Sequence, residues 1–597
     1  MDKPQGTRRR KARRRVMVLL VLCCAVFALF LARLAWLQFA MADHYAQKMA
    51  EAGSASYTLP QHAARGAITD RSGTVLAQDE TVYDVYLRVP APPGTNLRET
   101  VNTIAALTGG KDVETQLAAF CSAVSAGELP VTQGLDSTGA AAYYRAGLVQ
   151  NGAVRLAARG VRRWPDGTIL PHTLGFTGPI TAEQWPAARA QGLAMDATIG
   201  QNGLEAAYDT LLRGRDGQLQ INVGFDGVTR EAVQTSTPVP GCTLVLTLDA
   251  DLQKTLQTAL QNQMDTLRTT KGIGAGREVR AGAAVVVDVR TGGILAAASL
   301  PNFDLSRYRS DYAALSADSA APLLDRVCQG LYAPGSAFKP AVAAAALTVG
   351  IDPAATVNCT GKYFYYSNYH PGCLQYGHRG PVDLRTALEY SCNIFFYDTG
   401  RRLGVDTFSA MARQLGLAND TGVEITAAQG RLTWSTDTNY QDGLTLMAAI
   451  GQGNTAVTPL QLAQYAAALA NYGRKPTLHF ADRAVQPATG AAVWQYEPAF
   501  TEIPGGEAVF GPIRDGMKRM AQTARALREA PVTVAAKTGS PQLADTLPGG
   551  SHYVNSVLIG YAPADDPQIA MAVVLEYGGG GANAAPVMRA VLDAWFE

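Results

Sequence analysis

The chain has no net positive charge outside its first fifteen residues. Residues 1–15 hold eight Lys or Arg and one Asp, whereas the whole chain of 597 residues has a net charge of +1, which leaves about −6 for the rest. A nucleic-acid-binding protein concentrates basic residues on its folded body, so this balance excludes nucleic acid as a partner. Only one stretch is long and apolar enough to cross a membrane, so a single span and a large soluble body of more than one domain are expected.

Other signals are missing as well. The glycine run 578–581 is not followed by Lys-Ser/Thr, so it does not match a phosphate-binding loop and is interpreted as a strand-to-helix connection. No convincing long internal repeat occurs. The chain stops soon after its last expected helix, so no appended C-terminal module is expected.

Three short strings, each present once, carry most of the functional information: Ser336-Ala337-Phe338-Lys339, Ser391-Cys392-Asn393 and Lys537-Thr538-Gly539. Alone, each is more often structural, as a solvated helix pair, a turn and a strand end. Their joint occurrence in this order, 55 and then 146 residues apart, indicates a penicillin-recognising serine acyltransferase. In the second string, Ser391 would relay protons and the amide of Asn393 would hold substrate.

The first string lies where a turn is expected to become a helix. Pro334-Gly335 precedes Ser336, and an Ala-rich run, residues 341–347, follows it. Lys339 then lies one turn on, facing Ser336. A lysine can take the serine proton if burial and nearby cations lower its pKa. The free N–H groups at the helix start would stabilise the oxyanion that develops during attack on a carbonyl.

The third string ends an apolar run, residues 532–536, which has a strand pattern. Lys537, Thr538 and Gly539 would therefore lie at the edge of a sheet, where an extended peptide can pair. Lys537 brings a positive charge suited to a substrate carboxylate, and Thr538 and Ser540 bring hydroxyl donors. A peptide that ends in a free carboxylate fits this arrangement.

On these strings and on further segments, the chain resembles a class B penicillin-binding protein, a membrane-anchored peptidoglycan D,D-transpeptidase. Residues 65–77 are similar to the family's Arg-Gly-x-Ile-x-Asp-Arg-Asn-Gly element, with Ser72 in place of the usual Asn. The other family-like segments are residues 163–167, 172–178, 203–205, 246–249, 451–453 and 458–461.

The resemblance implies a mechanism. Ser336 would be acylated by the penultimate D-Ala of a stem pentapeptide, with Lys339 as general base and with release of the terminal D-Ala. An amine of a neighbouring stem would then attack the acyl-enzyme. Ser391 would pass protons toward the leaving and attacking nitrogens, while Asn393 would hold the substrate amide.

The same resemblance implies the rest of the site. Lys537 and Thr538 would bind the substrate side of the cleft, and the backbone N–H groups of Ser336 and Ser540 would form the oxyanion hole. Ser540 stands where the family usually has Thr, which keeps the hydroxyl and leaves substrate or β-lactam preference open. No cofactor and no metal are implied.

The implied ligands and partners are peptidoglycan stem peptides, β-lactams, a SEDS-type glycosyltransferase and other divisome or elongasome proteins. A β-lactamase or D,D-carboxypeptidase would use the same strings, but neither usually needs so long a pedestal or this anchor. A β-lactam sensor would need a signalling domain, for which the short basic tail has no room. A scaffold that activates a polymerising partner stays open, as does a role in division, elongation or sporulation.

The N-terminus reports location. After the basic residues 1–15, residues 16–32 form an uncharged apolar run that resumes after Arg33, so residues 16–40 are expected to form a transmembrane anchor. The positive flank should stay cytoplasmic, which places the catalytic part outside the cytoplasm. A cleaved signal peptide with a site at Ala40-Met41-Ala42 is the alternative, and the length of the apolar run favours the anchor.

The expected fold class is α+β. Residues 41–240 should form an elongated mixed pedestal, and residues 241–597 a penicillin-binding transpeptidase domain. Hairpins are expected at 283–298 and 553–576, followed by a closing helix at 586–596. Strands at both ends of the domain around a helical middle predict an antiparallel sheet flanked by helices.

The cysteines leave alternatives. Cys359 and Cys373 lie in a Tyr-rich stretch of an oxidising compartment, so a disulfide between them is the first prediction. A zinc site with His370 and His378 and free thiols are the alternatives. Cys392, inside the second string, is expected to point away from the cleft and to take no part in catalysis.

Overall fold

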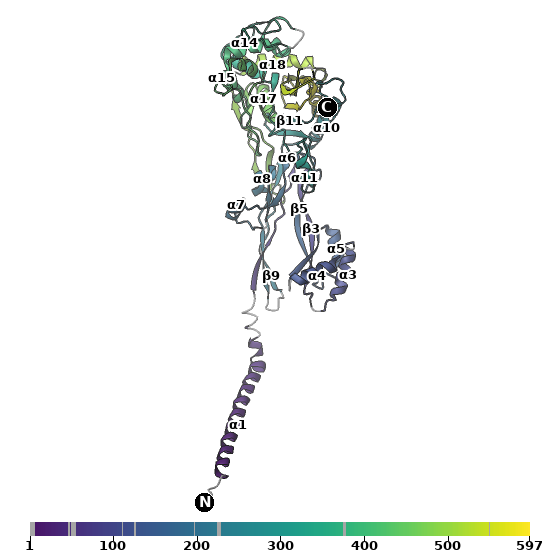
Figure 1. The fold of residues 1–597 in the computed structure, drawn as a ribbon, viewed down its shortest axis with the longest axis vertical. Helices are drawn as coiled ribbons and strands as arrows, with labels where there is room; N and C mark the ends of the chain where they lie inside the picture. The colour runs from purple at the N-terminus through teal and green to yellow at the C-terminus, as the bar shows by residue number, and fades with distance from the viewer. Residues whose placement is uncertain are drawn as a thin grey trace. The chain divides into compact units, whose positions relative to one another are not determined.

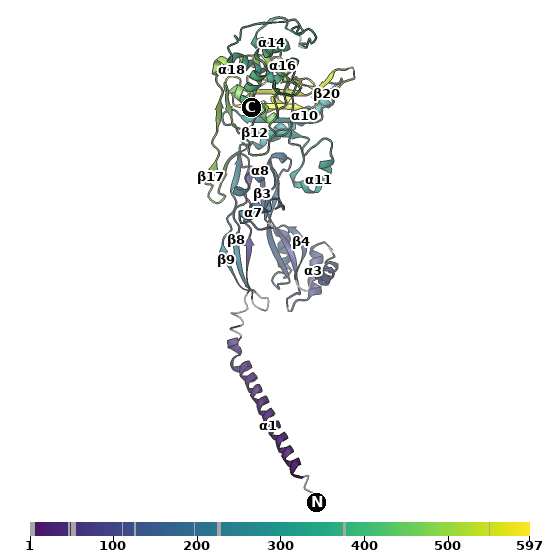
Figure 2. The same ribbon diagram turned by 60° about the vertical axis from the view of Figure 1, so that its left-hand side comes forward.

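The computed structural model describes residues 6–45, 48, 55–92, 94–109, 112–123, 127–195, 197–223, 229–373, 378–548 and 550–597. It divides into two compact units. The first unit comprises Met1–Ala63 and Arg215–Val239, and the second comprises Ala64–Gly214 and Pro240–Glu597. The ribbon is shown in Figures 1 and 2.

The first unit contains one long helix and a small sheet. Helix α1 (Gly6–Ala35) begins inside the basic tail and continues as a π-helical turn, Trp36–Ala40. Its segment Arg13–Ala40 has a mean hydropathy of 2.7 and is the one helix of the described residues that is long and apolar enough to cross a membrane. The antiparallel sheet has the order β1-β8-β9, with β1 Ala55–Gln61, β8 Gly217–Val223 and β9 Thr229–Ser236.

In the second unit, a seven-stranded sheet joins the residues expected in the pedestal to the start of the catalytic part. Its order is β17-β16-β10-β2-β3-β4, and β5 also pairs with β3. The strands are β17 Ala492–Gln495, β16 Ala481–Val485, β10 Thr243–Leu246, β2 Ile68–Thr69, β3 Val75–Val89, β4 Gly127–Leu135 and β5 Val154–Arg163. Because β10 pairs with both β2 and β16, the chain segments near 68, 244 and 484 are fixed side by side.

Three helices cover one end of this sheet: α3 (Leu97–Leu107), α4 (Val113–Ala123) and α5 (Ser137–Arg145). They lie beside β3, β4 and β5 in Figures 1 and 2. Their apolar faces share a core with Val85 and Leu87 of β3, which are fully buried. Asn96 and Asp136 cap α3 and α5 by accepting from backbone N–H groups three residues on.

A buried carboxylate connects two of the family-like segments, 65–77 and 203–205, to the end of β5. Glu205 is fully buried and accepts from Arg65 Nε (2.7 Å) and Arg162 Nε (2.6 Å). Arg65 also contacts Asp209 at 2.7 Å, and Arg162 donates to the carbonyl of Gly66 at 2.8 Å. Two arginines on one carboxylate satisfy its lone pairs away from water, so this cluster fixes how the segments meet.

The catalytic part of the second unit is built on a five-stranded sheet with the order β12-β11-β23-β22-β19. All four pairings are antiparallel, which confirms the expected sheet. The strands are β12 Ile294–Leu300, β11 Gly282–Asp288, β23 Ile569–Leu575, β22 Ser556–Ala562 and β19 Ala535–Gly539. The hairpin β11–β12 is confirmed, as is β22–β23, although β22 begins at Ser556 and not at 553.

Both faces of this sheet are buried. Alternate residues of β11 belong to two cores: Val285 packs toward α17 (Pro459–Ala470), and Val286 packs toward α10 (Ala250–Arg268) and α20 (Ala585–Phe596). Helix α17 is buried along its whole length and begins with a capping box, in which Thr458 and Gln461 exchange hydrogen bonds of 3.1 Å. The expected closing helix is α20.

Further helices surround the site: α12 Lys339–Thr348, α13 Leu384–Glu389, α14 Asn393–Leu403, α15 Val405–Gln414, α16 Asp442–Ala449 and α18 Gly506–Thr523. The short elements are α6 Pro171–Leu174, β6 Thr177–Pro179, α7 Trp185–Ala190, β7 Thr198–Gly200, α8 Gly203–Ala207, α9 Asp209–Leu212, η2 Leu305–Arg307, α11 Tyr308–Ala317, η3 Gly335–Phe338, β13 Val357–Cys359, β14 Gly380–Val382, β15 Arg474–Pro476, β18 Phe500–Glu502, α19 Arg525–Arg528, β20 Gln542–Thr546, β21 His552–Val554 and η4 Gly581–Ala584.

The buried cluster around Glu205 gives a stability prediction. Glu205→Ala removes the carboxylate that the two buried arginines share and leaves them only Asp209 and Asp79, so the free energy of unfolding should fall by about 3–5 kcal/mol. Glu80→Ala is the matched control, because Glu80 and its partner Arg163 are both 55% exposed, and it should cost less than about 1 kcal/mol. The thermal unfolding midpoint of the detergent-solubilised protein measures both. Equal midpoints for the two variants would contradict the assignment.

Candidate active site

Ser336 lies in the short 3₁₀ turn η3, directly before α12, which confirms the expected turn-to-helix junction. Gly335 has φ +55°, and its N–H donates to the carbonyl oxygen of Gly451 at 2.9 Å. A Cβ on Gly335 would lie 2.9 Å from the nitrogen of Pro541. Glycine is therefore required here by both the left-handed φ and the close approach of the chain.

Lys339 is fully buried one turn after Ser336. Its Nζ donates to the carbonyl oxygen of Ser391 at 2.7 Å, to Ser391 Oγ at 3.1 Å and to Asn393 Oδ1 at 2.7 Å. None of these contacts is to Ser336, although the sequence predicts that the two residues face each other. Burial lowers the pKa of Lys339 to about 7, so an appreciable neutral fraction exists near neutral pH.

Lys537 reaches the same hydroxyl from the sheet. It lies on β19, an edge strand as predicted, and is fully buried. Its Nζ donates to Ser391 Oγ at 3.0 Å and to the carbonyl oxygen of Thr538 at 3.2 Å. Burial lowers the pKa of Lys537 well below its usual range, and the charge of Lys339 lowers it further. Within the described part of the chain, neither lysine has a carboxylate partner.

Ser391 is thus the meeting point of the three strings. It is 8% exposed and has φ +55°, an uncommon backbone conformation for a residue with a side chain. Its Oγ accepts hydrogen bonds from both lysine amines, so its own proton is available to a third group. Asn393 begins α14, and its Nδ2 donates to the carbonyl oxygen of Gly372 at 3.2 Å.

A cavity of about 390 Å³ opens at these residues. Of the predicted site residues, Ser336, Ser391, Asn393, Thr538 and Ser540 line it, whereas the two lysines lie buried behind its wall. The remaining lining residues were not predicted as site residues: Tyr369, Pro371, Gly372, Tyr397, Met447, Ile450, Gln452, Gln542 and Val554. The family-like segment 451–453 was the one sequence signal that could have pointed to any of them.

Gly539 and the glycine run after β23 serve close packing. A Cβ on Gly539 would lie 2.2 Å from the carbonyl oxygen of Pro334, so β19 passes directly against the turn before Ser336. A Cβ on Gly581 would lie 2.5 Å from the carbonyl oxygen of Gly539. The N–H of Gly581 donates to Ser540 Oγ at 2.9 Å. The connection at 578–581 therefore packs against the end of β19 and holds the hydroxyl of Ser540 in place.

A second cluster lies immediately beside the second string. The ligand-type atoms of Cys359, Cys373, His378 and Cys392 all lie within 4.8 Å of one another, and all four residues are buried. The prediction of a Cys359–Cys373 disulfide is wrong in this structure, because no disulfide joins the two cysteines and Cys392 lies beside them. His370 is not part of the cluster. Cys392 is fully buried and does not line the cavity, as predicted.

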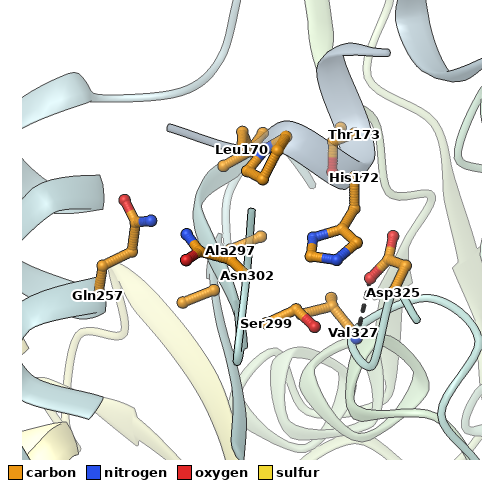
Figure 3. A pocket seen from close by; sticks show the side chains of 11 residues that line it. Leu170, His172, Thr173, Gln257, Ala297, Ser299, Asn302, Asp325 and Val327 are labelled. Atoms are coloured by element: carbon orange, nitrogen blue, oxygen red, sulfur yellow. Dashed lines mark hydrogen bonds between the residues drawn. The ribbon is translucent and has the colours of Figure 1, made fainter. Parts of the chain in front are cut away.

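A separate pocket of about 10 Å³ lies between α6, β12 and the segment before Val327 (Figure 3). None of the three strings lines it. His172 points into it, and its Nε2–H donates to the carbonyl oxygen of Pro322 at 2.7 Å. Burial lowers the pKa of His172. Asp325 lies opposite and accepts from the N–H of Val327 at 3.0 Å. The pocket is too small for a peptide, so these groups are interpreted as packing between the pedestal and the catalytic part.

The comparisons with known proteins agree with this geometry. A model of the penicillin-binding protein transpeptidase domain matches residues 282–593, and a model of the penicillin-binding protein dimerisation domain matches residues 60–246. The fold and the strings define a penicillin-recognising serine enzyme. The chain belongs to the class B penicillin-binding proteins, and it is a peptidoglycan D,D-transpeptidase.

Individual relatives cover nearly the whole chain. The chain is 29% identical to the peptidoglycan D,D-transpeptidase MrdA of Acinetobacter baumannii, over 96% of this chain and 86% of that protein. It is similar to a chain of a solved peptidoglycan synthase complex that coordinates polymerization and crosslinking, with 28% identity, a TM-score of 0.73 and 98% of each chain covered. The PBP2 of Helicobacter pylori, solved in complex with MreC, shares the fold, with 23% identity, a TM-score of 0.74 and 91% and 99% covered.

The pKa of Lys339 predicts the pH dependence of acylation. If neutral Lys339 takes the Ser336 proton, the acylation rate should rise through pH 7 and become level near pH 8, because the lysine is protonated below its pKa of about 7. Stopped-flow measurement with a fluorescent penicillin from pH 5.5 to 10 checks this, with the unfolding temperature recorded at each pH as the control. A rate that continues to rise toward pH 10 would mean that Lys339 keeps an ordinary pKa.

Proposed function

We propose that Ser336 is the nucleophile of this transpeptidase and that Lys339 is its general base. Ser336 Oγ attacks the carbonyl carbon of the penultimate D-Ala of a stem peptide, the C–N bond to the terminal D-Ala breaks, and an acyl-enzyme forms. An amine of a second stem then attacks that ester and forms the cross-link. The contacts of Lys339 are expected to move toward Ser336 when substrate fills the cavity, since catalytic hydrogen bonds often tighten only then.

Ser391 is proposed to carry the proton between Lys339 and the substrate nitrogen. The observation that supports this best is that its Oγ accepts from Lys339 and Lys537 at once, at 3.1 and 3.0 Å. With both lone pairs occupied, the O–H is directed by default toward a third acceptor, such as the leaving nitrogen. Lys339 and Ser391 then form one relay, and Lys537 sets the orientation of the hydroxyl.

The cavity wall supports the remaining roles. Thr538 and Ser540 line it and are proposed to bind the substrate carboxylate through their hydroxyl groups, with the N–H donors of the buried Lys537 amine directly behind them. Asn393 lines it as well and would hold the substrate amide. The N–H groups of Ser336 and Ser540 are proposed as the oxyanion hole, and Gly539 as the close contact that keeps β19 beside the turn.

The location and partners follow the same proposal. Residues 1–15 would be a cytoplasmic tail, 16–40 the anchor, 41–240 the pedestal and 241–597 the transpeptidase domain outside the cytoplasm. The basic residues that precede the apolar part of α1 support this orientation. The solved peptidoglycan synthase complex suggests a SEDS-type glycosyltransferase as partner, and the MreC complex suggests an elongasome protein.

Labelling with a fluorescent penicillin tests the nucleophile. The protein should form a stable adduct on Ser336, located by mass spectrometry, and Ser336→Ala should abolish it. Ser316→Ala, an exposed serine of α11, is the matched control and should label normally. An adduct on another residue, or full labelling of Ser336→Ala, would disprove the assignment.

We also propose that Cys359, Cys373, His378 and Cys392 bind a zinc ion. Three thiols and an imidazole are a ligand set that zinc prefers, and bound zinc would place them roughly 3.8 Å apart. The four ligand-type atoms already lie within 4.8 Å of one another, with Cys373 Sγ and His378 Nε2 3.6 Å apart. Zinc would supply the positive charge that three neighbouring thiolates require. Its role would be structural: Cys359 and Cys373 bracket a hairpin, and Cys392 lies between Ser391 and Asn393, so the ion would fix the second string.

Metal and thiol analysis tests this site. The purified protein should contain about one zinc per chain by mass spectrometry of the metal, and Cys359→Ser should lose most of it. Cys121→Ser, an exposed cysteine, is the control and should keep it. A metal-free protein with a Cys359–Cys373 disulfide in its non-reduced peptide map would restore the disulfide prediction and contradict the zinc site.

A further inference from the structure

An exposed aromatic surface lies beside the catalytic cavity, on the hairpin between Gly361 and Gly372. Five of the seven residues 363–369 are aromatic, whereas aromatic residues make up 8% of the chain. Phe364 is 63% exposed, Tyr365 59% and Tyr369 38%. We call these three side chains the aromatic platform. Three aromatic side chains that are exposed to solvent on one hairpin indicate an interaction site, because a folded core would bury them.

Buried contacts of Tyr363 and the side chain of Arg401 hold the aromatic platform in place. The hairpin is closed by the N–H of Tyr363, which donates to the carbonyl oxygen of Pro371 at 3.0 Å. The ring of Tyr363 is buried, and its hydroxyl donates to Asp398 at 3.0 Å and accepts from Arg401 Nε at 2.9 Å. The Arg401 guanidinium also lies over the ring of Tyr365, 3.9 Å from its centre.

These contacts connect the platform to the catalytic machinery. Asp398 and Arg401 belong to α14, the helix that begins with Asn393. Tyr369 itself lines the cavity that contains Ser336. The hairpin that carries the platform therefore adjoins the cavity through Tyr369 and is tied to α14 through Tyr363 and Tyr365.

The chemistry of the hairpin suits a sugar. Tyrosine rings offer large flat apolar surfaces with a polar tip, and Ser367 and Asn368 between them offer adaptable hydrogen bonds. A hexosamine presents C–H groups on one face and hydroxyl and acetamido groups around its rim, which is the complementary pattern. Residues 361–372 contain no carboxylate and include Lys362, so no charged group on this hairpin favours a cationic ligand.

The reach of a stem peptide places a sugar near this surface. A five-residue peptide spans at most about 17 Å when extended. If its penultimate residue is at Ser336, the sugar to which the stem is attached must lie within that distance, outside the cavity. A peptide is expected to pair with the edge strand β19, which leaves the aromatic platform for the saccharide.

We propose that the aromatic platform binds the sugar of the glycan strand that carries the stem peptide. This inference rests on the proposed function and names the part of the substrate that the cavity does not enclose. Phe364 and Tyr365 would position the polymer and would not touch the reacting atoms. They would therefore raise the affinity for glycan-linked stems and leave the chemistry at Ser336 unchanged.

Three substrates show whether the platform binds the sugar, the peptide or neither. They are a disaccharide-linked pentapeptide, the free pentapeptide and a fluorescent penicillin. For Phe364→Ala and Tyr365→Ala, KM for the disaccharide-linked substrate should rise roughly five- to ten-fold, as expected for the loss of one ring-stacking contact, while kcat holds. Reaction with free pentapeptide and with penicillin should not change. Tyr144→Ala, at a tyrosine that is 49% exposed and lies outside the hairpin, is the matched control. Phe364→Trp keeps an aromatic ring, so its KM should stay that of the unaltered protein.

Other results would overturn the inference. Equal losses on the free and the disaccharide-linked peptide would assign the platform to the peptide. Unchanged KM for every substrate would remove the sugar from this surface and leave it to a protein partner. Reduced penicillin labelling in Phe364→Ala or Tyr365→Ala would show that these rings shape the cavity itself, which contradicts a role confined to the glycan. Loss of labelling in the unaltered protein would instead contradict the proposed nucleophile.

Discussion

Two lysine amines hydrogen-bond to one serine hydroxyl in the interior, and the arrangement of the catalytic unit depends on holding them there. Each comes from a different element: Lys339 from α12 and Lys537 from the edge strand β19. Burying two like charges without a carboxylate is expensive, and the structure lowers this cost by making neutral amines favourable. A neutral amine beside a serine hydroxyl is the requirement of a proton relay, so the same burial that costs stability prepares the chemistry.

Close backbone approach keeps the three strings together. The turn before Ser336 lies against β19 on one side and against Gly451 on the other. At Gly335, Gly451 and Gly539 an added Cβ would come within 2.9 Å or less of a backbone atom of a neighbouring segment. Side chains at these positions would push the strands and the turn apart. The left-handed φ of Ser391 belongs to the same constraint, because it turns the hydroxyl toward both lysines.

The sequence predicted those parts of the fold and site that depend on local patterns. The turn before Ser336, the two hairpins, the edge position of Lys537 and the closing helix all follow from short-range periodicity and turn residues. The partners of Lys339 and Lys537 could not be predicted in this way, because Ser391 lies 52 and 146 residues from them. The sequence brought Cys359, Cys373 and His378 together as one alternative, but it missed Cys392 for the same reason, because Cys392 lies at a helix start in another part of the chain.

The most direct test of this account is the pKa of Lys339 itself. Nitrogen-15 NMR of the detergent-solubilised protein with labelled lysine side chains, assigned by comparison with Lys339→Arg, would follow its Nζ signal with pH. The account predicts that this signal titrates at about pH 7. Titration near the usual pKa of about 10.4 would mean that Lys339 stays protonated in the resting enzyme, and the proposed base would be wrong.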